Sequence, residues 1–151
     1  MMVCMNKGLI FIARALFSLI FLFAGIRALM NWQGTLEGLY TLFSNWSLFV
    51  GERPLLKELL EWTMTKLPLL FGIALFLELF GGVLLITGIK VRLGALSLLL
   101  FLIPVTALFH PFWFEVGLDR EREISAFLKN IALIGALLYF LSAPQPKKSA
   151  P

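Results

Sequence analysis

Four long apolar segments constrain this chain more than any other feature of its sequence. They cover roughly residues 9–30, 67–88, 93–109 and 124–141. A helix of about 20 apolar residues is long enough to cross the hydrocarbon core of a bilayer. The segments therefore predict an all-α integral membrane protein that folds as a bundle of four transmembrane helices.

The composition supports this assignment and argues against a soluble enzyme. Hydrophobic residues make up 60% of the 151 residues and charged residues only 15%, whereas soluble domains carry about 25% charged residues. A chain of this length corresponds to one domain. We expect a single membrane domain over residues 1–142 and a disordered, polar and proline-rich tail over residues 143–151.

The first apolar segment has a competing interpretation as a signal peptide, because it follows Lys7 and is strongly apolar. Its length and the presence of Arg14 within it favour a transmembrane helix, since the apolar part of a signal peptide is about 7–15 residues long.

Residues 31–66, between the first two apolar segments, are too numerous and too apolar for a simple turn. Pro54 is a good first residue for a helix. Apolar side chains then follow near one helical face: Leu55, Leu56, Leu59, Leu60 and Met64. This pattern predicts a short helix that lies at the membrane surface or caps the bundle.

The distribution of charge predicts an orientation. With four crossings, one side of the membrane carries only basic side chains, namely Lys7, Lys90, Arg92, Lys147 and Lys148. The other side carries longer loops in which basic and acidic residues mix, and all four tryptophans: Trp32, Trp46, Trp62 and Trp113. By the positive-inside rule we expect both termini in the cytoplasm and the tryptophan-rich loops outside.

Several function classes find no support in the sequence. Nucleic-acid binding requires clustered basic residues with stacking aromatic residues on a solvated face, and no such cluster is present. Cys4 is the only cysteine, so the chain has no paired-thiol redox motif. With one histidine and no inward cluster of carboxylates, we expect no metal site built by this chain alone. Any redox role would borrow a cofactor, a quinone or a partner.

Three of the four segments show a face of small or polar residues at helical spacing. The faces are Arg14, Ser18, Phe21, Gly25 and Ala28 in the first segment, Glu78, Gly81 or Gly82, Leu85 and Gly88 in the second, and Ser125, Lys129, Ala132 and Ala136 in the fourth. Small residues allow helix backbones to approach closely in lipid. We therefore expect all three faces to point into the bundle.

Glu78 is the ionisable residue of the second segment and lies near mid-bilayer, where a charge costs at least ~2.5 kcal/mol. It therefore needs a partner or a proton, and Arg14 and Lys129 are the candidate partners. Chemistry favours Arg14, because an arginine keeps its charge and grips a carboxylate with two hydrogen bonds. The polar interior is either a site for a ligand, proton or quinone headgroup, or a buried lock that fixes helix register.

His110 lies at the outer end of the third segment, followed by Pro111, Phe112 and Trp113. A histidine there can exchange protons near neutral pH or donate a hydrogen bond to a carbonyl group. A structural role as a cap or interface residue is the alternative.

The order and spacing of these motifs resemble the DoxX-like membrane proteins, which are related to the DoxD subunit of archaeal thiosulfate:quinone oxidoreductase. The resemblance rests on residues 14–25, residues 78–88 with Arg92, residues 109–113 and residues 127–130. It implies a four-helix membrane bundle linked to quinone-dependent sulfur oxidation or to complexes that handle oxidative stress. The positions that it marks for testing are Arg14, Glu78, His110, Lys129 and Asn130.

Three functions compete at this point. The first is a subunit of a redox or quinone-linked complex in a bacterial-type plasma membrane, with a quinone as candidate cofactor and a protein partner that supplies electrons. The second is a non-enzymatic scaffold or assembly factor. The third is a small carrier component that uses the Glu78 carboxylate.

Overall fold

The computed structural model describes residues 7–51, 53–113 and 115–142, and the regular secondary structure of this part of the chain is entirely α-helical. The helices are α1 (Lys7–Met30), α2 (Trp32–Val50), α3 (Pro54–Thr65), α4 (Leu67–Thr87), α5 (Val91–Phe109) and α6 (Gly117–Ser142). The expected disordered tail, residues 143–151, lies outside the described residues.

Four of these helices, α1, α4, α5 and α6, are long and apolar enough to cross a membrane. They coincide with the four apolar segments of the sequence, so the predicted number and placement of the long apolar helices are confirmed. Each is at least 19 residues long, which corresponds to roughly 28 Å of helix.

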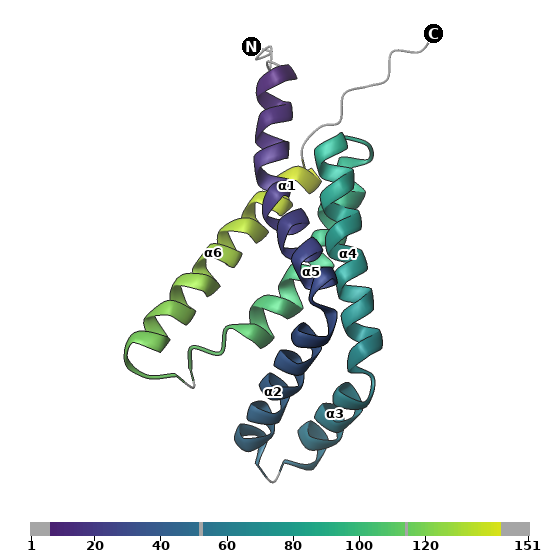
Figure 1. Ribbon diagram of the computed structural model, residues 1–151. Helices are drawn as coiled ribbons and strands as arrows, with labels where there is room; N and C mark the ends of the chain where they lie inside the picture. Colours follow the sequence, from purple (N-terminus) through teal and green to yellow (C-terminus); the bar gives the residue numbers. More distant parts are fainter. Residues whose placement is uncertain (1–6, 52, 114, 143–151) are drawn as a thin grey trace.

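The helices form a bundle around the α4–α5 hairpin (Figure 1). α1 packs against α4, and α6 packs against α5. The start of α1, the end of α6 and the α4–α5 turn lie at one end of the bundle, which we call the terminal end. The opposite end, the loop end, holds α2 and α3, and there α6 diverges from the other helices.

Glycines bring the three central helices close together. A β-carbon added at Gly81 of α4 would lie 2.9 Å from the backbone oxygen of Gly94 in α5, and one at Gly94 would lie 3.0 Å from the oxygen of Gly81. On the other side of α4, a β-carbon at Gly82 would lie 2.8 Å from Leu22 of α1. The Gly81 and Gly94 contacts are with backbone atoms that cannot rotate away, so these two glycines set the spacing of α4 and α5.

The predicted inward faces are confirmed in α1 and α4 but wrong in α6. Ser18, Phe21 and Gly25 are buried in α1, and the α4 face is buried from Glu78 to Leu85. In α6, by contrast, Ser125, Lys129 and Ala132 are exposed and Ala136 is half-buried. α6 instead packs through large side chains against the main core: Leu133, Ile134, Leu137, Phe140 and Leu141. Because these side chains fill the space beside α5, the small residues of α6 face outward.

Residues 31–66 contain two helices where the sequence predicted one. The helix predicted from Pro54 is confirmed as α3, and it buries no residue. The second helix, α2, was not predicted. It buries Leu36, Leu39 and Phe43, and these side chains form a second core with Leu67 of α4. The spacing of these apolar residues by three and four positions was the signal that the sequence contained.

Candidate functional site

Glu78 lies in the middle of α4, and its side chain is buried against α1 with 6% of its surface exposed. Its position is set by Gly25, because a β-carbon added there would lie 3.3 Å from the carboxylate oxygen Oε2. Within the described residues, the structure gives the carboxylate no hydrogen bond and no ion pair. The group is therefore a buried acid whose hydrogen-bonding capacity is unused.

A cavity of about 470 Å³ opens beside Glu78. Pockets that bind small molecules are typically 300–1,000 Å³ and mostly apolar. The walls come from α1 (Ala24, Ala28), α2 (Thr35, Leu39, Phe43), α3 (Thr63), α4 (Leu67 to Glu78) and α5 (Leu100 to Phe109). Glu78 is the one ionisable side chain among these lining residues.

The α5 wall of the cavity contains an interrupted helical hydrogen bond. Pro104 lies inside α5 and has no N–H group, so the carbonyl of Leu100 lacks its usual helical donor. Both residues line the cavity. Thr35 and Thr63 also line it, but each donates its hydroxyl hydrogen to a carbonyl of its own helix. The carboxyl group of Glu78 and the backbone of α5 are thus the groups available to orient a ligand.

The structure does not bring Arg14 and Glu78 together, although the sequence favoured this pair. α1 and α4 run antiparallel, so Gly25 faces Glu78 while Arg14 faces Gly88 at the terminal end. Glu78 lies about 15 Å from Gly88 at 1.5 Å per residue along α4. α1 extends beyond the α4–α5 turn (Figure 1), so Arg14 lies beside this turn and not level with Glu78.

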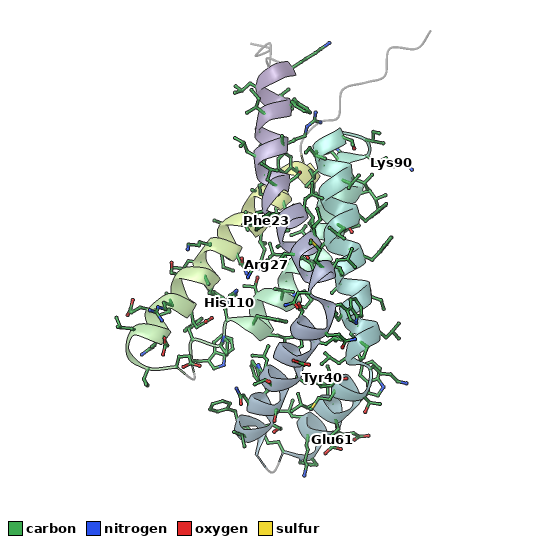
Figure 2. All side chains as sticks on the ribbon, viewed as in Figure 1. Phe23, Arg27, Tyr40, Glu61, Lys90 and His110 are labelled. Atoms are coloured by element: carbon green, nitrogen blue, oxygen red, sulfur yellow. The ribbon has the colours of Figure 1, made fainter. Side chains whose placement is uncertain are left out.

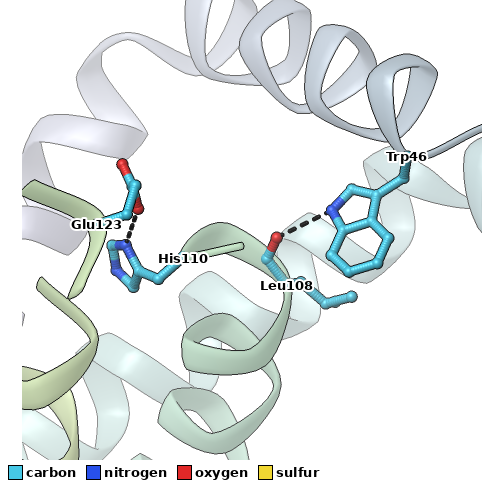
Figure 3. A network of polar contacts seen from close by, with 4 residues as sticks. All are labelled: Trp46, Leu108, His110 and Glu123. Carbon is cyan, nitrogen blue, oxygen red and sulfur yellow. Dashed lines mark hydrogen bonds and ion pairs between the residues drawn. The ribbon is translucent and has the colours of Figure 1, made fainter. Parts of the chain in front are cut away.

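The remaining marked residues lie on or near α6, away from Glu78. Nδ1 of His110 lies 2.8 Å from a carboxylate oxygen of Glu123 and links the end of α5 to the first turns of α6 (Figure 3). Lys129 is exposed and Asn130 is half-buried. The described residues show no hydrogen bond or ion pair between any two of the five marked side chains.

α2 closes the loop end of the site. The indole N–H of Trp46 donates a hydrogen bond of 3.1 Å to the carbonyl of Leu108, near the end of α5 (Figure 3). At the other end of α2, the ring of Trp32 packs on Phe71, a cavity-lining residue, with ring centroids 4.5 Å apart. The sequence predicted tryptophans at the membrane interface but did not indicate that two of them hold the cavity wall.

A second, more polar hollow of about 400 Å³ lies at the junction of α1 and α2 and is lined by Arg27 and Asn31. Figure 2 shows Arg27 at this junction. The hollow shares Ala24, Ala28 and Thr35 with the Glu78 cavity. Small side chains therefore separate the buried carboxyl group from the loop end of the protein.

The comparison with protein families agrees with this architecture. A family model described as DoxX matches residues 9–111. The chain belongs to the DoxX family. No curated protein and no solved structure matches it.

The DoxX match spans α1 to α5, and so it includes the Glu78 cavity, Arg14 and His110. It ends before α6. Lys129 and Asn130 consequently lie beyond the region that defines this chain as a DoxX protein, whereas every cavity-lining residue lies within it.

Proposed function

We propose that this DoxX protein is the membrane subunit of a redox complex and that its Glu78 cavity binds the head ring of a quinone. The observation that supports this most directly is the apolar cavity of about 470 Å³ with one buried, unpartnered carboxyl group in its wall. A quinone ring is flat, apolar on both faces and polar only at its two carbonyl oxygens. It therefore needs mostly apolar walls and few hydrogen-bonding groups.

Glu78 would supply the polar contact. In its protonated form the carboxyl group donates a hydrogen bond to a quinone carbonyl. Reduction of the quinone to the quinol takes up two electrons and two protons. Glu78 supplies one proton and the solvent supplies the other. The Glu78 carboxylate that remains then takes a proton from the solvent. The electrons come from a partner protein, in keeping with a subunit of a larger complex.

We place the complex in a bacterial-type plasma membrane, with the terminal end of the bundle in the cytoplasm. The basic side chains of that end and the mixed charges of the loop end support this orientation. Cysteines introduced at Ser44 and Lys148 test it in intact cells. A membrane-impermeant thiol reagent should label position 44 and spare position 148, and labelling of both would contradict the four-span topology.

Quinone binding can be measured by tryptophan fluorescence, because Trp32 packs on a cavity-lining ring. The full chain in nanodiscs would be titrated with a short-chain quinone. We expect saturable quenching that Trp32→Phe largely removes. Glu78→Leu should weaken binding about tenfold, because leucine cannot donate a hydrogen bond and a lost hydrogen bond of about 1.4 kcal/mol corresponds to a factor of ten.

Glu61→Leu provides the matched control, because Glu61 is exposed on α3. It should leave the quenching curve unchanged. Quenching that does not saturate, or that is equal in Glu78→Leu and Glu61→Leu, would show only partition of the quinone into lipid and would contradict the proposal. Purification of the native complex adds an independent test, because an oxidoreductase should copurify; its absence would favour the scaffold function.

A further inference from the structure

Arg14 occupies a position at the terminal end that the quinone proposal does not use. Its guanidinium group lies over the α4–α5 turn, directly against the backbone of Gly88. A β-carbon added at Gly88 would lie 2.5 Å from Nη1 and 2.9 Å from Cζ of Arg14. Gly88 also has a φ of 74°, in the left-handed region. Glycine at this position thus allows the left-handed backbone conformation of the turn and leaves space for the guanidinium group.

The charge of Arg14 has no counter-ion within the described residues. Its Nε atom is buried and has no hydrogen-bond partner, and the same is true of the hydroxyl of Ser18 one helical turn further along α1. An arginine at the edge of the hydrocarbon is costly unless an anion or water meets it.

No acidic side chain of the described residues lies near enough to serve. Glu78 is about 15 Å away along α4, and the other acidic residues that the structure describes lie in α2, in α3 and in residues 115–123, at the loop end. Residues 1–13 and 86–110 contain no aspartate or glutamate, and neither do residues 124–151. The described part of the chain therefore supplies no acidic counter-ion, and the guanidinium group is open to an anion from outside.

The surroundings of Arg14 favour an anion with several oxygen acceptors. Lys90 is exposed in the turn, and Arg92 follows it in the first turn of α5. The first N–H groups of α5 have no helical acceptors, and no side chain caps them. The guanidinium fork of Arg14, the exposed positive charge of Lys90 and the N-terminus of α5 lie at one turn, and together they match a phosphate group.

We propose that the Arg14 site binds the phosphate of an anionic membrane lipid. The membrane is the source because exposed apolar side chains flank the site on both helices. Leu9, Phe11 and Ile12 extend from α1 beyond the turn, and Ile89 and Leu93 lie beside it. These side chains can contact acyl chains while the headgroup phosphate meets Arg14. The site lies at the opposite end of α1 from Arg27 and is independent of quinone binding.

Native mass spectrometry of the full chain in detergent tests this, with phosphatidylglycerol and phosphatidylcholine as probes. The wild-type protein should retain phosphatidylglycerol in preference to phosphatidylcholine. Arg14→Gln should weaken phosphatidylglycerol binding at least tenfold, because a charge-assisted pair is lost. The affinity of Arg14→Lys for phosphatidylglycerol should lie between those of the wild type and Arg14→Gln. Lysine keeps the charge but cannot form two parallel hydrogen bonds. Arg27→Gln is the matched control and should bind like the wild type.

Equal binding by wild type, Arg14→Gln and Arg27→Gln would overturn the proposal. If Arg14→Gln does not fold, Lys90→Gln provides a second test, because Lys90 is exposed. Lys90→Gln should weaken phosphatidylglycerol binding several-fold. An unchanged affinity would count against the site. Inorganic phosphate distinguishes the two sources of this anion. Millimolar phosphate should not displace the lipid, and displacement would assign the site to a soluble anion instead.

Discussion

The helices α5 and α6 are both apolar, and each contains a glycine among large side chains. They nevertheless pack in different ways. α5 buries a continuous face from Val91 to Thr106, whereas only Leu137 is buried in α6. Gly81 and Gly94 meet backbone to backbone, but a β-carbon at Gly135 of α6 would have no neighbour within 4 Å. A glycine in a membrane span thus indicates close packing only where another helix lies directly against it.

Exchange of glycine for leucine should give the largest difference between the two regions. Gly81→Leu places a side chain where a β-carbon would already lie 2.7 Å from Leu98 and 2.9 Å from the oxygen of Gly94. Because the second neighbour is backbone and cannot rotate away, we expect a loss of about 3 kcal/mol in the free energy of unfolding. Gly135→Leu should change it by less than about 0.5 kcal/mol. Thermal unfolding in detergent measures both, and equal losses would show that α6 is packed in solution.

Glu78 is the polar exception on the tightly packed side, and its removal should stabilise the protein. A carboxyl group without a partner in an apolar cavity costs about 2 kcal/mol or more, so Glu78→Leu should raise the melting temperature while it weakens quinone binding. The exposed control Glu61→Leu should change the melting temperature little. A lower melting temperature for Glu78→Leu would mean that the carboxyl group has a stabilising partner.

The double variant Arg14→Leu/Glu78→Leu tests whether these two charged residues interact. Because Arg14 and Glu78 lie far apart along the α1–α4 interface, the effects of Arg14→Leu and Glu78→Leu should add within about 0.5 kcal/mol. Strong rescue of Arg14→Leu by Glu78→Leu would instead demonstrate the ion pair that the sequence suggested. The same melting experiments provide this measurement.

A substitution at Trp46 tests how strongly α2 is held against the end of α5. Trp46→Phe keeps an aromatic ring but removes the indole N–H that bonds to Leu108, and a lost hydrogen bond of this kind costs about 1 kcal/mol. The effect should be local, with faster hydrogen exchange in α2 and unchanged exchange in the α4–α5 hairpin. Trp62→Phe, on the exposed surface of α3, is the control and should leave exchange in α2 unchanged.

The smallest effect is expected where α6 diverges. Glu123→Gln weakens the contact with His110, which is partly exposed, so its loss should cost less than about 1 kcal/mol. Glu121→Gln on the exposed surface is the matched control. Spin labels on α5 and α6 should show a broader distance distribution in Glu123→Gln than in Glu121→Gln. Identical distributions would mean that packing at the terminal end alone holds α6.

Local chemistry made much of the fold predictable. Each membrane span is a run of apolar residues that must form internal hydrogen bonds in lipid, so its existence follows from composition. The inward faces of α1 and α4 were predictable for a related reason, because small and polar residues recur there at helical spacing. The Pro54 start of α3 is likewise a property of one residue and its neighbours.

The sequence by itself determined that this chain has four helices long and apolar enough to cross a membrane, because apolarity and length act within each segment. The tertiary structure alone decided which side chains meet. It placed Arg14 opposite Gly88 and Glu78 opposite Gly25, turned the small residues of α6 outward, and packed α2 on α4 to enclose a cavity. These outcomes depend on the relative shift and rotation of neighbouring helices, which are set by contacts between segments distant in sequence and cannot be read from the periodicity of any one segment.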